Sequence, residues 1–334
     1  MYLNECEEVS FRPLPGPLWI LSQTRAFEVI ASRVDVLHEP FLGIVKPLAV
    51  PTVVTIHDLI PILFPQMVPR AFRFYFQHVL PTVLDHSDAV IADSQTTADD
   101  LVRICGVPRS KVYVVHLGSD HIAATQASDD RGSGAPLPPA RRYFLVVGTG
   151  PSKRVEDAIE AFAAAHGDLP PGIELRIVGR PGGPAKAALK GWRGAPERVV
   201  FIEQISRERL AALYRGAEAV VHSAMYEGFG LVPLEAMRSG VPVISTNGGA
   251  LAEVSNSAVM QVPVGGIDQL SKAMVDVMEP SHRRTLVAAG HRHARKFTWA
   301  TTADKTIQVY RRVVGKDAED WTEQLRQSAG PVSA

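Results

Sequence analysis

The sequence predicts an α/β protein built from two doubly wound domains. Short apolar stretches alternate with helical patterns over most of the 334 residues, and a segment rich in Gly, Pro and Ser at 127–142 interrupts this alternation. Apolar strands separated by helices indicate parallel sheets that are covered on both faces. The length also suits two domains of roughly 100 to 200 residues each. We therefore expect two Rossmann-like domains that face a cleft, where open parallel sheets bind ligands.

Composition excludes several classes of function. Lys plus Arg and Asp plus Glu number 35 each, so no overall charge attracts nucleic acid, and an anionic ligand needs a local site. Cys6 and Cys105 lie too far apart for a CxxC motif, which favours a reducing compartment. No apolar run reaches the roughly 18 residues of a membrane span. We therefore expect a cytoplasmic protein.

The first domain is predicted to span residues 1–120. Its long helical pattern should be kinked or ended at Pro81, because proline cannot donate the helical hydrogen bond. A second helix should begin at Ser94 or Gln95 and stop at Gly106. The strands are expected in VDVLHEP at 34–40, TVVTIHD at 52–58, AVIADS at 89–94 and VYVVHLG at 112–118.

A linker at 121–141 is predicted to lead into a second domain at 142–296. A helix at 297–316 should pack back toward the first domain, and the polar end at 317–334 should be loose. The strands of the second domain are expected in YFLVVGT at 143–149, ELRIVGR at 174–180, VVFIEQ at 199–204, AVVHS at 219–223 and PVIST at 242–246.

The segment VVGTGPSK predicts one half of a phosphate site. Gly148 and Gly150 begin a GxGxxG pattern, but Lys153 occupies the third glycine position, and no P-loop motif occurs. A strand, a glycine turn, Lys153 and Arg154 then lead into a helix, whose N-terminus favours an anion. Two solvated charges in a turn are the alternative reading, and the more common one for such a turn alone.

The segment YEGFGLVPLEAM predicts the other half. Gly228 and Gly230 allow positive φ or a close backbone approach between a strand and a helix start. Glu235 lies in the first turns of that helix, where it can cap the helix or accept hydrogen bonds from a diol such as ribose. Each glutamate alone is more often a cap or a surface charge, but Glu227 and Glu235 together with Lys153 favour a ligand site.

These residues resemble the E-x7-E signature of the retaining glycosyltransferases of family 4, which have the GT-B fold. Glu227 and Glu235 are the two glutamates of that signature. The resemblance extends over most of the chain, in the blocks TIHDLIP, ADSQTTADDL, GVPRSKVYVV, VVGTGPSKRVEDAIEAF, LRIVG, RLAALYRGAEAVVHSA, SGVPVISTNGGALAEV and FTWATTADKTIQVYRRV. It implies a nucleoside-diphosphate sugar in the second domain and an acceptor in the first.

The resemblance also assigns roles to individual residues. Lys153, assisted by Arg154, would contact the diphosphate, Glu227 the transferred sugar and Glu235 the ribose. His57, after the strand TVVTI, would lie near the transferred sugar. Ile205 would contribute backbone to the base site, and the donor phosphates and sugar would be lined by backbone groups of Gly228, Phe229, Gly230 and Leu231.

The implied reaction transfers a hexose, of mannose or glucose type, from a nucleoside-diphosphate sugar to a saccharide or lipid-linked acceptor. The anomeric configuration would be retained, because the leaving phosphate helps to deprotonate the acceptor hydroxyl on the same face. The resemblance of TIHDLIP favours GDP-mannose and polysaccharide biosynthesis. No cofactor and no metal ion are expected, since no Asp-x-Asp motif is present.

The start of the chain departs from the family pattern. Relatives open with a strand and a glycine-rich loop, whereas MYLNECEEVSFRPLPG has no such turn, so we expect a first domain that is incomplete at its start. A naturally short member, a start codon placed too far downstream, and a partner chain that completes the domain are competing explanations. A non-catalytic nucleotide-sugar-binding subunit or inactive homologue is therefore the rival function. The cluster HRHARK at 291–296 is either a solvated helix face or a peripheral contact with the inner membrane face.

Overall fold

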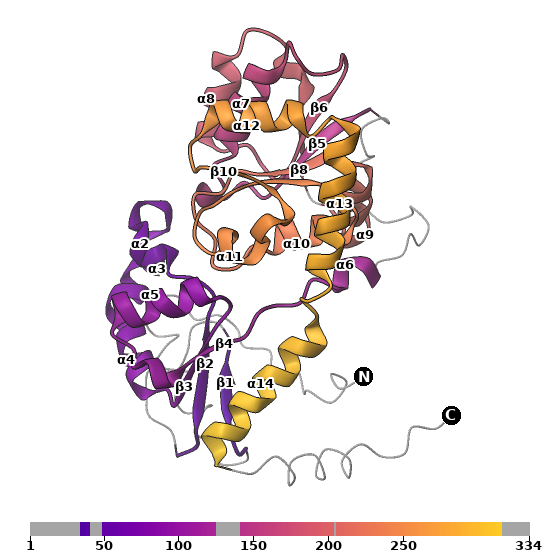
Figure 1. The fold of residues 1–334 in the computed structure, drawn as a ribbon. Coiled ribbons are helices and arrows are strands. Elements are labelled where there is room, and N and C mark those ends of the chain that lie inside the picture. The colour runs from indigo at the N-terminus through magenta and orange to yellow at the C-terminus, as the bar shows by residue number, and fades with distance from the viewer. Residues whose placement is uncertain (1–33, 41–48, 125–140, 204, 316–334) are drawn as a thin grey trace.

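Two parallel sheets lie one above the other in the structure (Figure 1). The computed structural model describes residues 34–40, 49–124, 141–203 and 205–315. Every strand pairing recorded in either sheet is parallel. The predicted α/β class with two Rossmann-like domains is confirmed. The first 16 residues, the proline-rich part of the linker and the end of the chain lie outside the described residues.

The first sheet has the order β1-β2-β3-β4 within the described part of the chain. Its central strands are buried at every position, as their continuous apolar sequences predict. His57 and Asp93 follow two neighbouring strands of this sheet, so both lie at its carboxyl edge. The strands are β1 (Leu37–Glu39), β2 (Thr52–Ile56), β3 (Ala89–Ala92) and β4 (Val112–Val114).

The helices of the first domain follow their sequence signals. Pro81 lies in the first turn of α4, which continues directly from a π-helical turn at Tyr75–Val79, so the helical hydrogen bonding changes just before the proline but the helical segment does not end there. The Ser94 hydroxyl caps α5, and Gly106 ends it in the left-handed conformation. The helices are α2 (Ile60–Leu63), α3 (Arg70–Phe74), α4 (Leu80–His86) and α5 (Gln95–Cys105).

The second sheet has the order β10-β9-β8-β5-β6-β7. From β5 the successive strands are added first on one side, as β6 and β7, and then on the other side, as β8, β9 and β10, so the strand order reverses between β5 and β8. Such a reversal is the topological switch point where doubly wound sheets bind ligands. The strands are β5 (Tyr143–Val147), β6 (Glu174–Val178), β7 (Val199–Ile202), β8 (Ala219–His222), β9 (Val243–Thr246) and β10 (Met260–Val262).

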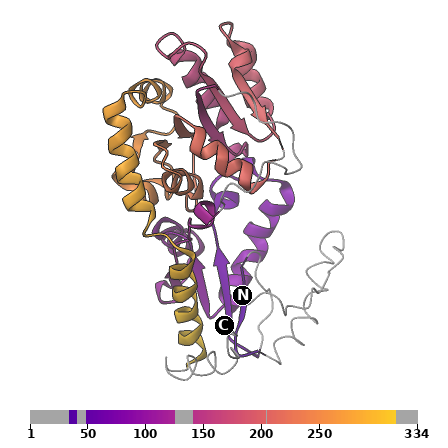
Figure 2. The ribbon, with the colours of Figure 1, turned by 90° about the vertical axis from the view of Figure 1, so that its right-hand side faces the viewer.

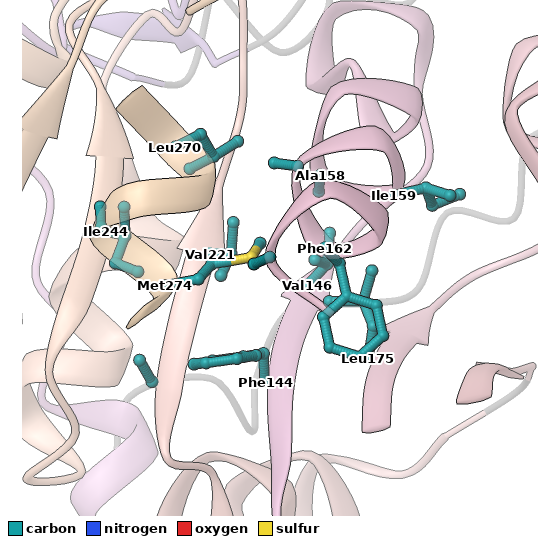
Figure 3. Packing of buried hydrophobic residues seen from close by; sticks show 14 of the residues in the cluster. Phe144, Val146, Ala158, Ile159, Phe162, Leu175, Val221, Ile244, Leu270 and Met274 are labelled. Carbon is teal, nitrogen blue, oxygen red and sulfur yellow. The ribbon is translucent and has the colours of Figure 1, made fainter. Parts of the chain in front are cut away.

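Helices cover both faces of the second sheet. Phe144 of β5 points to one face, where Phe162 packs edge-on against it, and Figure 3 shows Leu270 and Met274 in the same cluster. Leu145, one residue along β5, points to the opposite face. The helices α7 (Val155–Ala165), α8 (Gly183–Gly191) and α12 (Ile267–Asp276) contribute to the first cluster, and α9 (Arg207–Gly216), α10 (Leu231–Arg238) and α13 (Pro280–Ala294) to the second.

The last helix, α14 (Trp299–Val314), runs from the second domain along the first sheet. Figure 2 shows α13 and α14 following one side of the molecule in succession. Val309 of α14 packs in a cluster with Val53 and Ile91 of β2 and β3, and the Tyr310 hydroxyl lies 2.6 Å from Nδ1 of His38. The domain boundaries themselves stay predictions. No helix in the described ranges has both the length and the apolarity needed to cross a bilayer.

Candidate functional site

The site lies where the loops after β5 and β8 meet at the switch point. Lys153 belongs to the loop after β5 and Glu227 to the loop after β8, and these strands are neighbours although about seventy residues separate the two side chains. The lysine Nζ lies 2.5 Å from the Oε1 atom of Glu227. The structure therefore brings together the two halves of the site that the sequence predicted separately.

Glu227 stays ionised in this environment. Burial raises the pKa of its carboxyl, but contacts with His222 and Lys153 outweigh burial and lower this pKa to about 2. The His222 side chain is fully buried, and burial lowers its pKa. Its Nε2 atom lies 3.3 Å from Oε1 of Glu227, without the geometry of a hydrogen bond. Within the described residues no donor contacts Oε2, so this oxygen can accept a hydrogen bond from a ligand.

Backbone contacts fix the positions of both loops. The Ser223 hydroxyl donates to the carbonyl groups of Lys153 and Arg154, at 2.9 Å each, and thereby ties the end of β8 to the lysine loop. On the other side, the Ala250 N–H donates to the Glu227 carbonyl at 2.9 Å. The charged pair is thus held by backbone geometry as well as by its own attraction.

The GFG turn presents backbone N–H groups at a helix start. Gly230 has φ 110° and stands as the N-cap of α10 without a side-chain cap. No backbone N–H from Gly228 to Leu231 donates a hydrogen bond to another described group. Unpaired amides at a helix N-terminus favour an anion. Phe229 can contribute backbone alone, because its ring is buried against His116 and Phe297.

Glu235 accepts two hydrogen bonds from the protein. The Tyr214 hydroxyl donates to Oε2 at 2.7 Å, and Nε2 of His121 lies 2.9 Å from Oε1. Nε1 of Trp299 donates to Nδ1 of His121 at 3.1 Å, so this imidazole carries its proton on Nε2 and donates it to the glutamate. The carboxylate is oriented by groups from α9, from α6 (His121–Ala124) and from the start of α14.

His57 lies at the edge of the first sheet that meets the second domain. Its Nδ1 lies 2.7 Å from the buried Asp93 carboxylate, and its Nε2 lies 2.9 Å from the Pro40 carbonyl. Both partners offer acceptor oxygens, which favours the form of the imidazole with a proton on each ring nitrogen. The hydrogen bond with Asp93 is the main reason why the pKa of His57 is raised. A cavity of about 220 Å³ beside His57 and Asp58 is otherwise lined by Ile56, Ile60, Pro61, Val68, Phe72 and Phe76.

Two predicted donor residues have other contacts. Both guanidinium contacts of Arg154 go to Asp157, at 2.7 Å each, so its charge is matched within the start of α7. Ile205 precedes Ser206, the N-cap of α9, and packs against the apolar cluster on that face of the sheet. The structure does not bring either side chain to the Lys153–Glu227 pair, and the contacts expected of Arg154 with the diphosphate and of the Ile205 backbone with the base stay predictions.

Several residues of the site carried no clear sequence signal. His222 interrupts an apolar strand, and this could have marked it as a polar residue at the switch point. Tyr214 and His121 had no comparable signal, because their role depends on how α9 and α6 pack beside Glu235. The strand-end positions of His57 and Glu227 were predictable from the alternation of strands and helices.

Comparisons with known proteins give a consistent result. The model of "Glycosyltransferase Family 4" matches residues 3–121, and that of "Glycosyl transferases group 1" matches residues 134–293. A D-inositol 3-phosphate glycosyltransferase of Mycolicibacterium smegmatis is 30% identical over 251 residues, which are 70% of this chain and 54% of that protein. The protein of that name from Rhodococcus opacus is 30% identical, over 69% of this chain and 54% of its own. The chain spans about half the length of the curated relatives it matches.

Solved structures are similar in fold. Sucrose-phosphate synthase from Thermosynechococcus elongatus has a TM-score of 0.67 and 22% identity, over 93% of this chain and 82% of its own. Anabaena Alr3699/HepE, solved with UDP and glucose, has a TM-score of 0.67 and 18% identity, over 89% of this chain and 83% of its own. A trehalose-phosphate synthase from Burkholderia xenovorans, solved with glucose-6-phosphate, has a TM-score of 0.65 and 12% identity, over 88% of this chain and 78% of its own. At these identities the similarity shows the fold, which is GT-B.

Proposed function

Because this chain belongs to the family 4, group 1 glycosyltransferases, we propose that it transfers a hexose from a nucleoside-diphosphate sugar to a saccharide or lipid-linked acceptor. The observation that carries the proposal is the Lys153–Glu227 pair at the switch point, beside the unpaired N–H groups of the GFG turn. A lysine next to unpaired amides suits a diphosphate, and an ionised carboxylate suits the hydroxyl groups of a sugar.

The proposed donor takes over contacts that the protein now makes internally. Lys153 turns from Glu227 to the diphosphate, and the freed carboxylate of Glu227 accepts from a hydroxyl of the sugar. Glu235 accepts from the ribose while it keeps Tyr214 and His121, since each carboxylate oxygen has two lone pairs. These assignments give the nucleotide and the sugar one carboxylate each.

The proposed transfer retains the anomeric configuration. The bond from the anomeric carbon to the diphosphate oxygen breaks, a bond to the acceptor oxygen forms on the same face, and the acceptor proton passes to the leaving phosphate. Lys153 and the turn amides stabilise the charge that develops on this leaving group. The described residues include no cluster of three His, Cys, Asp or Glu that could hold a metal ion.

The acceptor is placed on the side of the first domain. The cavity beside His57 and Asp58 is mainly apolar, which suits the pyranose face of a sugar or the apolar part of a lipid-linked acceptor. GDP-mannose as donor, a role in polysaccharide biosynthesis, and a cytoplasmic location with peripheral contact at the membrane belong to the same proposal.

Substitution of Lys153 tests the proposal. We expect Lys153→Ala to lower the rate of hexose transfer by about a hundredfold or more, because the loss of one contact to a developing oxyanion costs about 2.7 to 4 kcal/mol. Release of UDP or GDP from the corresponding hexose donors measures this rate. Lys186→Ala, at an exposed position of α8, is the matched control.

Two outcomes would reject parts of the proposal. A loss smaller than threefold in Lys153→Ala would remove Lys153 from the diphosphate site. Binding of a nucleoside diphosphate by calorimetry, without transfer or hydrolysis of any hexose donor, would favour the rival function of a non-catalytic nucleotide-sugar-binding chain.

A further inference from the structure

A carboxylate of the second domain caps a helix of the first domain. Glu253 lies on α11 (Leu251–Ser255), which faces the start of α5 (Figure 1). Its Oε1 accepts from the Gln95 N–H at 2.8 Å, and its Oε2 accepts from the Thr96 N–H at 2.9 Å and the Thr96 hydroxyl at 3.0 Å. Nε2 of His116 lies 3.3 Å from Oε1. Four polar groups of the first domain thus converge on one side chain.

The chemistry of a helix start explains why this contact is strong. The first N–H groups of a helix have no partner within the helix and carry its partial positive charge. Ser94, the N-cap of α5, accepts from the Thr97 N–H alone, which leaves the N–H groups of Gln95 and Thr96 for Glu253. Burial raises the pKa of Glu253, but His116 and the hydrogen bonds from α5 lower it to about 2, so the carboxylate is ionised near neutral pH.

The same helix also holds the donor loop. The Thr97 hydroxyl donates to the Gly228 carbonyl at 3.2 Å, and the Tyr226 hydroxyl donates to Asp100 at 2.6 Å. Residues on both sides of Glu227 therefore bind α5. Glu253 is connected to this loop as well, because Ala250, three residues before it, donates its N–H to the Glu227 carbonyl.

We propose that Glu253 is a positioning residue that holds the first domain, and with it His57, in register with the Glu227 loop. The inference rests on the proposed function for its catalytic consequence, although the contact itself can be tested without turnover. Glu253 touches neither the proposed donor nor the proposed acceptor. It acts through α5. Glu253 fixes the first turn of this helix, and the following residues of the helix, Thr97 and Asp100, bind the loop on either side of Glu227.

The test compares Glu253→Ala and Glu253→Gln with the control Glu197→Ala, at an exposed position distant in sequence from both helices. We expect Glu253→Ala to lower kcat by about ten- to hundredfold, the range for lost hydrogen bonds to a charged group. The Kd of UDP or GDP should change by less than about threefold, because the proposed diphosphate and ribose contacts belong to the second domain. Glu253→Gln should show a smaller loss of kcat, since the amide oxygen keeps one acceptor.

Small-angle X-ray scattering supplies a readout that is independent of activity. Glu253→Ala should increase the radius of gyration, and Glu197→Ala should not. A double-mutant cycle with Thr96→Val should show that the two substitutions are not additive in kcat, as expected for groups in contact. An unchanged radius together with unchanged kcat would overturn the inference. Equal losses in kcat and in diphosphate affinity, with a lower melting temperature, would assign Glu253 a structural role instead.

Failure of the proposed function gives a different pattern. If the wild-type chain binds no nucleoside diphosphate and turns over no donor, the catalytic part of the inference falls with that function. The scattering comparison then still decides whether Glu253 holds the two domains together.

Discussion

At the scale of single residues, the environments of Glu227 and His57 shift the pKa of each side chain toward its charged form. The pKa of Glu227 is lowered despite burial, because an ammonium group and an imidazole lie beside it. The pKa of His57 is raised, because each ring nitrogen faces an acceptor. The proposed site therefore combines a carboxylate of the second domain with an imidazole of the first domain whose protonated form is favoured by its neighbours.

The raised pKa of His57 predicts a pH-dependent contribution to stability. Its folded pKa lies above the unfolded value of 6.5, so the contribution is complete below about pH 6.5 and is lost as the pH rises through the folded value. His57→Ala should thus cost more stability at about pH 5.5 than at about pH 9. Because the side chain is 47% exposed, the difference should be about 1 kcal/mol or less.

Urea unfolding at the two pH values measures this difference. Gln77→Ala, at an exposed position of the first domain, is the control and should cost the same at both pH values, because the side chain that it removes is not ionisable. An equal cost of His57→Ala at both pH values would mean that the imidazole is not held in its doubly protonated form by Asp93 and Pro40.

At the scale of elements, the turn between β8 and α10 depends on the absence of a side chain at Gly228. A Cβ atom there would lie 1.9 Å from the His57 carbonyl oxygen and 2.7 Å from the Asp58 Cβ. Both neighbours belong to the segment after β2 of the first domain. The turn therefore touches the opposite domain with its backbone, and the close approach is possible because residue 228 is glycine.

Gly228→Ala should consequently disturb the relation between the domains. We expect at least a tenfold loss of transfer activity, because misplacement of a site by about 1 Å can cost a hundredfold in rate. Gly191→Ala, at the end of α8 where an added Cβ meets open space, should leave activity unchanged. Wild-type turnover in Gly228→Ala would show that the contact between the turn and His57 is not needed for the reaction.

Elements were more predictable from the sequence than contacts. Ser94 and Gly106 mark the start and the end of α5 as their types predict, and a π-helical turn stands just before Pro81, because caps and proline act on the local backbone. The partners of Glu235 could not be predicted, since His121 lies 114 positions away and reaches it through the packing of α6. The contact of Arg154 with Asp157 in the following helix was not predicted either, although the two residues are only three positions apart.

At the scale of the whole molecule, α14 connects the two domains mechanically. Phe297, just before the helix, packs in the second domain, where Phe229 of the GFG turn lies against it. Val309, further along the helix, is buried against Val53 and Ile91 of the first sheet. The helix therefore adds to the contacts that Glu253, Tyr226 and the GFG turn make with the first domain, so we expect the domains to unfold as one cooperative unit rather than as two.

Val309→Ala tests this coupling. Loss of two buried carbon groups should destabilise the protein by about 2 kcal/mol, from lost burial and the cavity that remains. Leu175→Ala, in the core of the second domain, should cost about 2 to 5 kcal/mol. If the domains are coupled, calorimetry should show a single unfolding transition, and each substitution should lower its midpoint temperature. Two transitions, with each variant shifting one of them, would mean that the contacts through α14, Glu253 and Gly228 are too weak to hold the site closed, and that ligands must then supply the remaining free energy of domain association.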